Sequence, residues 1–256
     1  MHNNIEMAEV TEDFARCWNA AGLRIQNQAQ GQLQSWLRSH LNPPFLEHLS
    51  FRLGNQLFYI QVEDVEGLLA TPGSLEGLLT IADSCAGHAC LMPMKRVGQD
   101  WEPTESGWGL VDARTRLPVN PPALITDEML EMTDWELQDL AVQVVRERIA
   151  KDGHQLMSWN GDPRVNPSVW FVGASGGPEW VLVRAVRYPE KEATEPENMT
   201  ELKSHFDKMG FSGHFASVAI ASADDPFDPD AERNGNFVPL YRGCGMHIRY
   251  EGLRPL

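Results

Sequence analysis

Cysteine is scarce in this sequence. The 256 residues include only four cysteines, and these are scattered along the chain rather than clustered. A protein held together by disulfides carries more cysteines at closer spacing, so the composition excludes a disulfide framework. We therefore expect reduced thiols at all four positions, which are Cys17, Cys85, Cys90 and Cys244.

Long apolar runs are also missing. No stretch approaches the roughly 20 apolar residues that a membrane-spanning helix needs. The first six residues, Met1–Glu6, lack the basic stretch and apolar core of a signal peptide. Together with the expected reduced thiols, these absences predict a cytoplasmic protein with no membrane contact.

Basic residues are outnumbered by acidic ones. The chain has 21 Lys and Arg against 36 Asp and Glu, which gives a formal net charge of −15. The excess is present on both halves, with 8 basic and 14 acidic side chains up to residue 126 and 13 and 22 beyond it. Because nucleic-acid binding depends on Lys and Arg that neutralise phosphates, nucleic acid is an unlikely partner. The charge fits plain solubility or a basic protein partner.

Motifs with a recognised chemistry are absent as well. The sequence has no Gly-rich phosphate loop, nucleophile elbow or kinase signature. The acidic segment 224–232 lacks the turn glycine and terminal glutamate of a calcium loop. Structural zinc sites usually use paired Cys-x2–4-Cys units with matching partners, and the best available set does not form two such units: Cys85, His88 and Cys90 with Cys244 and His247. We predict no metal, no cofactor and no catalytic residue.

What the sequence does contain is a regular alternation of helical and strand patterns. In the first half, apolar residues at helical spacing predict one helix from Thr11, ended by Gly22, and a second helix at about 26–41. Later elements of this half are predicted strands at 49–53 and 57–62, a helix at 74–84 capped by Ser74, and strands at 88–94 and 108–113. The proline-rich stretch 117–122 is the best linker candidate.

The second half begins with a clear helix signal. Thr133 and Glu136 have the spacing of a capping box, in which each side chain satisfies a free backbone amide at a helix start. The predicted helix ends near Gly153. It is followed by predicted strands at 155–159, 165–172 and 179–189, a helix at 200–209, and strands at 214–221 and 246–250.

The two halves predict the same order of elements. Each reads helix, hairpin, helix, strand, long loop, strand, and a Gly-His pair enters the strand after the second helix in both, at His88 and His214. We predict a mixed α/β (α+β) protein of two similar, duplicated units, 1–122 and 123–256, each with a mixed central sheet flanked by helices. Whether the units pack as one globule is left open.

The hairpin of the second half is the most informative stretch. Two apolar, β-branched and aromatic runs, 165–172 and 179–189, flank the turn glycines Gly176 and Gly177. The second run carries Arg184 and Arg187, although a buried strand is normally apolar. Both arginines can be half-buried residues paired with acids such as Glu179 or Glu190, or they can bind an anion or a partner's carboxylate.

This hairpin, with its surrounding helices, resembles the active-site region of the PD-(D/E)xK, or restriction-endonuclease-like, superfamily over residues 133–222. In that family an acid follows a proline on one strand and Glu-x-Lys lies on the next, where both carboxylates hold a divalent metal. The matching positions here are Pro167-Ser168 and Arg184-Ala185-Val186. Serine is a poor Mg²⁺ ligand, arginine puts positive charge at the metal position, and valine cannot replace the lysine.

The resemblance implies that the metal-dependent reaction is lost. If the family likeness is right, Ser168, Arg184 and Glu136 converge in one cleft. The residues predicted to bind a ligand or partner are Ser168, Arg184, Arg187, Glu136 and His214. His214 and His88 can form a pair for proton transfer, although a histidine that enters a strand after glycine is more often bonded to a nearby backbone carbonyl.

Three functions follow from these patterns. The first is a non-catalytic, nuclease-like scaffold that acts as a binding or regulatory protein. The second is a metal-dependent hydrolase or nuclease with a relocated acid, either Glu136 or Glu147. The third is a structural subunit that forms homodimers through exposed aromatic side chains, which the eight tryptophans favour.

Overall fold

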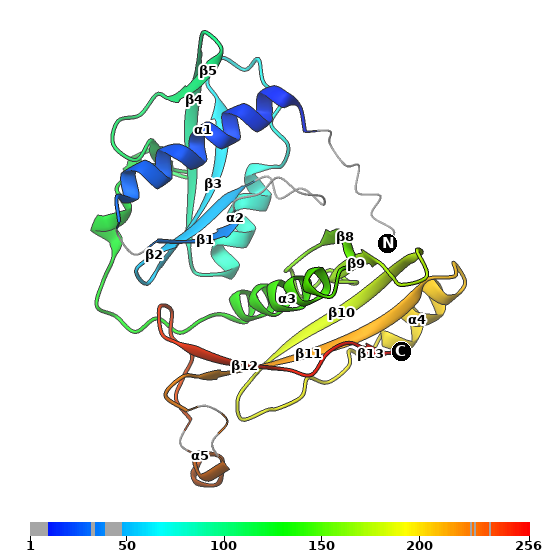
Figure 1. The fold of residues 1–256 in the computed structure, drawn as a ribbon. Coiled ribbons are helices and arrows are strands. Elements are labelled where there is room, and N and C mark those ends of the chain that lie inside the picture. The colour runs from blue at the N-terminus through cyan, green and yellow to red at the C-terminus, as the bar shows by residue number, and fades with distance from the viewer. Residues whose placement is uncertain (1–9, 32–33, 39–47, 226, 228, 236) are drawn as a thin grey trace. The chain divides into compact units, whose positions relative to one another are not determined.

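The computed structural model describes residues 10–31, 34–38, 48–225, 227, 229–235 and 237–256. The chain divides into two compact units, Met1–Met129 and Leu130–Leu256 (Figure 1). Both units mix α-helices with a mixed parallel and antiparallel sheet, in agreement with the predicted fold class. Within the described residues, no helix is both long and apolar enough to cross a bilayer.

Among its described residues, the first unit has two α-helices, a short 3-10 helix and a sheet of seven strands in the order β1-β2-β3-β4-β6-β7, with β5 paired to β4. The parallel pair β3–β4 is joined by a crossover through α2. The elements are α1 (Glu12–Ala29), β1 (Gln34–Arg38), β2 (Leu49–Leu53), β3 (Gln56–Asp64), α2 (Leu75–Ser84), β4 (His88–Val97), β5 (Asp100–Pro103), β6 (Leu110–Asp112), β7 (Pro118–Val119) and the short 3-10 helix η1 (Pro121–Leu124).

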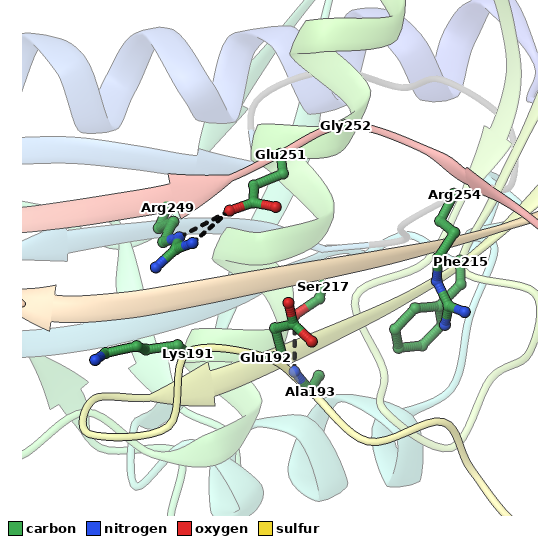
Figure 2. Close-up of a pocket in the computed structure, with 9 residues that line it drawn as sticks. All are labelled: Lys191, Glu192, Ala193, Phe215, Ser217, Arg249, Glu251, Gly252 and Arg254. Carbon is green, nitrogen blue, oxygen red and sulfur yellow. Dashed lines mark hydrogen bonds and ion pairs between the residues drawn. The ribbon is translucent and has the colours of Figure 1, made fainter.

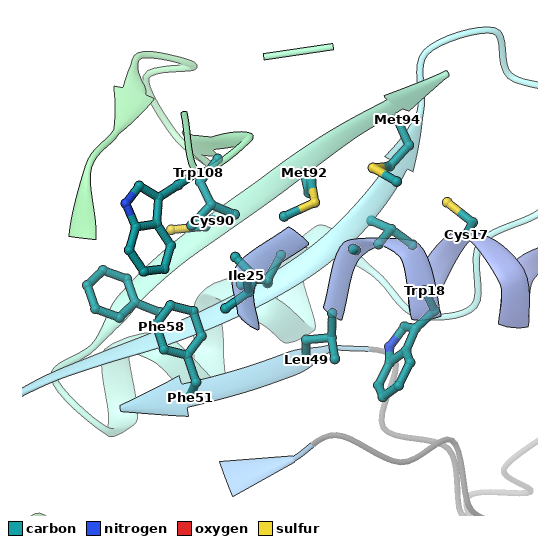
Figure 3. Packing of buried hydrophobic residues seen from close by; sticks show 14 of the residues in the cluster. Cys17, Trp18, Ile25, Leu49, Phe51, Phe58, Cys90, Met92, Met94 and Trp108 are labelled. Carbon is teal, nitrogen blue, oxygen red and sulfur yellow. The ribbon is translucent and has the colours of Figure 1, made fainter. Parts of the chain in front are cut away.

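Helix α1 supplies one wall of the first unit's core. Its buried residues recur at helical spacing and pack against alternate residues of the strands, because side chains on a strand point to opposite faces in turn. Figure 3 shows Trp18 and Ile25 of α1 in one buried cluster with Phe51, Phe58 and Met92 of the strands. Helix α2 covers the other face of this sheet, as Figure 1 shows.

The second unit repeats this plan. Its described residues form a sheet in the order β12-β11-β10-β9-β8, with β13 paired to β11, and its parallel pair β10–β11 is joined by a crossover through α4. The elements are α3 (Asp134–Lys151), β8 (Gln155–Trp159), β9 (Val169–Val172), β10 (Pro178–Arg187), α4 (Met199–Asp207), β11 (Ser212–Ser222), α5 (Pro229–Asn234), β12 (Met246–Tyr250) and β13 (Arg254–Pro255).

The alternation of β10 separates two cores in the second unit. Val181 and Val183 belong to the cluster formed with helix α3. Trp180 and Leu182 belong to the cluster formed with helix α4. The two helices therefore cover opposite faces of the sheet, and a side chain's position along β10 decides which helix it meets.

The Gly-His pair is built in the same way in both units. His88 is the register partner of Phe58, and His214 is that of Val181, each across the parallel strand pair. A Cβ at Gly213 would lie 2.3 Å from the ring of the buried Trp180, and one at the equivalent Gly87 would lie 2.9 Å from the ring of Tyr59. Glycine is therefore needed at both positions because the preceding strand's aromatic side chain occupies the space.

Most predicted elements are confirmed, but the helix predicted at 26–41 is wrong. Helix α1 runs through Gly22 to Ala29 and is followed by strand β1, while Leu41 lies outside the described residues. A glycine inside a helix costs about 1 kcal/mol, which tertiary packing can offset. The actual stop is at Gln30 and Gly31, which take the left-handed conformation that ends many helices.

Two other expectations need revision. The proline-rich stretch 117–122 is not a linker, because its Pro118–Val119 forms strand β7 of the first sheet, and the division between the units falls after Met129. The eight tryptophans also contribute less exposed aromatic surface than expected, because four are buried and four are half-buried.

Candidate functional site

Ser168 stands at the start of the strand that the resemblance singles out. Its side chain is fully buried, and its hydroxyl oxygen accepts a hydrogen bond from the backbone amide of Val183 at 3.2 Å. Its own amide donates to the carbonyl of Val181 at 2.9 Å. Ser168 therefore continues the pairing of β9 with β10 by one residue, and its oxygen is used to satisfy the sheet.

Arg184 is a residue of β10, lies next to Ser168 and is half-buried. Its guanidinium donates to the side-chain oxygen of Asn166 at 2.8 Å and to the carbonyl of Val183 at 2.7 Å. Both acceptors are neutral, so the predicted pairing with Glu179 or Glu190 is wrong. Burial lowers the pKa of Arg184, which remains a cation at every ordinary pH.

Arg187 is held at the C-terminal end of β10 by acids at the start of helix α3 and just before it. It pairs with Glu131 at 3.0 Å and with Asp134 at 3.2 Å, and it also donates to the carbonyl of Met132. The prediction that this arginine pairs with acidic residues is confirmed, but the partners are not the predicted ones. The guanidinium ties β10 to the start of α3.

Glu136 forms a buried ion pair that the sequence does not signal. Its two carboxylate oxygens each accept from Arg242 at 2.9 Å, and the two side chains are only 8% and 2% exposed. One of these oxygens also accepts from the amide of Thr133 at 2.8 Å, which completes the predicted capping box. With these bonds the carboxylate of Glu136 links the start of α3 to the segment before β12.

The three residues expected to share a cleft do not do so. Arg184 follows Trp180 and Leu182 in the alternation of β10, so it belongs to the face that α4 covers. Glu136 belongs to α3, which covers the opposite face. The expectation of one shared cleft is wrong, although Ser168 and Arg184 do lie together.

His214 has a side-chain partner rather than the expected backbone carbonyl. Its Nε2 lies 2.6 Å from a carboxylate oxygen of Glu179, and both side chains are less than one-fifth exposed. In the first unit, Nε2 of His88 lies 3.0 Å from the amide oxygen of Gln56. Gln56 and Glu179 each stand two residues before the histidine's register partner, so the contact is a repeated feature of the fold.

His214 is also remote from the other predicted residues. It lies level with Val181 on β10, six residues from Arg187, which corresponds to about 20 Å along a strand. The five predicted binding residues therefore occupy three places. These are Ser168 with Arg184, Arg187 with Glu136 near the start of α3, and His214 with Glu179.

The residues considered for zinc do not assemble into a site. Among the described residues, no three or more His, Cys, Asp or Glu side chains gather as ligands for a metal. Burial raises the pKa of the Cys90 thiol to about 12, which keeps it protonated near neutral pH. A protonated thiol is neither a good ligand nor a nucleophile.

Sequence reasoning missed a charged pocket in the second unit. This pocket, of about 310 Å³, opens on the face of β11 that carries Phe215 and Ser217 (Figure 2). The charged residues that line it are Lys191, Glu192, Arg249, Glu251 and Arg254. They come from two segments far apart in the sequence, the loop after β10 and the stretch from β12 to β13, so no local pattern identifies them.

A family model described as a domain of unknown function (DUF8840) matches residues 135–256, which covers nearly all of the second unit. Neither the curated proteins nor the solved structures that were compared gave a match.

Proposed function

We propose that this chain is a non-catalytic binding or regulatory protein of the cytoplasm, whose second unit is a nuclease-like scaffold. The support for the likeness is the order of elements alone, because α3, strands β8 to β10, α4 and β11 follow the helix, three strands, helix and strand of the restriction-endonuclease-like core. The convergence of Glu136 with Ser168 and Arg184, which the likeness also implied, is not found. The likeness implies where metal ligands would stand, but the residues of this chain at those positions are not metal ligands.

The observation that carries the proposal is how Ser168 and Arg184 are bonded at the position where the likeness implies a metal. Ser168 uses its hydroxyl oxygen to satisfy Val183, and the adjacent Arg184 brings a positive charge that repels a divalent cation. A metal-activated water needs carboxylate or other oxygen ligands around the ion. A serine bonded to backbone and a guanidinium do not provide them.

The acids proposed for a relocated active site are also poorly placed. Glu136 is enclosed in its pair with Arg242. Glu147 is exposed and belongs to the outer side of α3, away from the buried stripe that includes Val145 and Ile149. The excess of acidic residues on this chain favours a basic protein partner over nucleic acid.

A hydrolysis assay tests the proposal. The purified chain is incubated with plasmid DNA and, separately, with bis(p-nitrophenyl) phosphate in the presence of Mg²⁺, Mn²⁺ or Zn²⁺. We expect no cleavage above that of the same reaction without protein. Metal-dependent cleavage by the wild type that is lost in Glu136→Gln or Glu147→Gln would overturn the proposal and identify the relocated acid.

A further inference from the structure

The charged pocket of the second unit arises from an irregularity in its sheet. Strand β12 ends with Tyr250 opposite Val218, and β13 begins with Arg254 opposite Phe215. Three residues of one strand therefore face two of the other, as in a β-bulge. Gly252 in this segment has a φ of 111°, which only glycine adopts readily, and Figure 2 shows the segment arching over the pocket.

The pocket presents both signs of charge around one hydroxyl. Arg249 donates through Nε to Glu251 at 3.0 Å. Arg254 is ion-paired with Glu195 and lies over the ring of Phe215, with its guanidinium carbon 5.2 Å from the ring centroid. Ser217 accepts from the amide of Ala193 at 2.7 Å, so its own proton remains to be donated to a ligand. The lining thus offers cationic donors, carboxylate acceptors and a hydroxyl within one small space.

The corresponding place in the first unit is built differently. A pocket of about 160 Å³ lies there against β3 and β4, and its charged residues are Glu63, Asp64 and Arg116. Arg116 is paired with Glu63 at 2.6 Å, as Arg249 is with Glu251 in the second unit, and the lining of this pocket has two acidic side chains and one basic one. Of these two pockets, only that of the second unit has three basic side chains in its lining.

From these contacts we infer that the charged pocket of the second unit binds a small zwitterion of amino-acid or dipeptide size. A carboxylate of the ligand meets Arg249, Arg254 and Lys191, and its ammonium group meets Glu192 and Glu251. A ligand of one sign would leave like charges facing it, and an anion would also be repelled by a chain of net charge −15. The volume lies at the lower end of small-molecule sites.

This inference rests on the proposed binding function and gives it a ligand class. Calorimetric titration of the whole chain uses three probes of similar length, glycylglycine as the zwitterion, succinate as the dianion and putrescine as the dication. We expect glycylglycine to bind most tightly. Binding should shift the backbone amide resonances of Ala193 and Gly252 in a ¹H–¹⁵N spectrum, since both residues line the pocket.

Two substitutions that each remove one positive charge locate the site. Arg249→Gln should weaken glycylglycine binding at least about tenfold. Arg233→Gln, which removes an exposed arginine of α5 that does not line the pocket, should leave binding unchanged. No binding up to about 10 mM glycylglycine, tighter binding of succinate or putrescine, or indifference to Arg249→Gln would overturn the inference. Because none of these results depends on hydrolysis, the inference can fail while the non-catalytic proposal stands.

Discussion

Replacing Glu136 with glutamine is expected to lower the free energy of unfolding of the second unit by about 3–5 kcal/mol. The substitution takes the carboxylate of Glu136 away from the buried guanidinium of Arg242, and both side chains are almost fully enclosed. It also weakens the acceptor for the amide of Thr133 at the helix start. Urea denaturation followed by tryptophan fluorescence measures the loss.

Two controls separate this effect from ordinary surface changes. Glu147→Gln makes the same chemical change on an exposed position of the same helix and should alter stability by no more than about 0.5 kcal/mol. The double variant Glu136→Met, Arg242→Met removes both charges and should lose less than Glu136→Gln alone. Equal stability of wild type and Glu136→Gln would contradict the structural role and reopen the case for Glu136 as a functional acid.

Replacing Gln138 with leucine should cost about 1–3 kcal/mol of unfolding free energy, the penalty for a buried polar group left unpaired. Strand β9 begins pairing only at Val169, so the backbone of β10 beyond residue 182 lacks a strand partner on that side. The buried amide of Gln138 fills the gap by accepting from Ala185 at 3.1 Å and donating to the carbonyl of Val183 at 2.9 Å. Leucine can do neither.

Gln143→Leu is the matched control because Gln143 lies on the same helix and bonds Asp139 within it. Its substitution should change stability by no more than about 0.5 kcal/mol. Chemical denaturation of the two variants side by side gives the comparison. Similar losses for both would mean that the side chain of Gln138 does not substitute for a missing strand.

The order of elements could be predicted because it depends on local patterns. Thr133 and Glu136 show the capping box in their spacing alone, and Ser74 caps α2 as expected, accepting from Gly77 at 3.0 Å. The repeat was also visible, since the Gly-His entry into a strand reflects a close approach that both units share. The spacing of apolar residues predicts these elements because it depends on which face of a helix or strand is buried.

The partners of the charged residues could not be predicted, because they depend on segments far apart in the chain. Arg242 pairs with a residue 106 positions away, and Arg187 reaches back 53 positions to Asp134. The failed helix at 26–41 has a different cause. Leu33, Trp36 and Leu37 fit a helical stripe, but β1 pairs with β2 and long-range pairing overrides local spacing.

The proposed function requires that the position of Ser168 and Arg184 in the second unit binds no divalent metal. Calorimetric titration of the whole chain with Mg²⁺ and Mn²⁺, compared with titration of Arg184→Met, tests this requirement. We predict no heat of binding in either protein at millimolar metal. Stoichiometric binding of one ion by the wild type, weakened by Ser168→Ala, would contradict the claim.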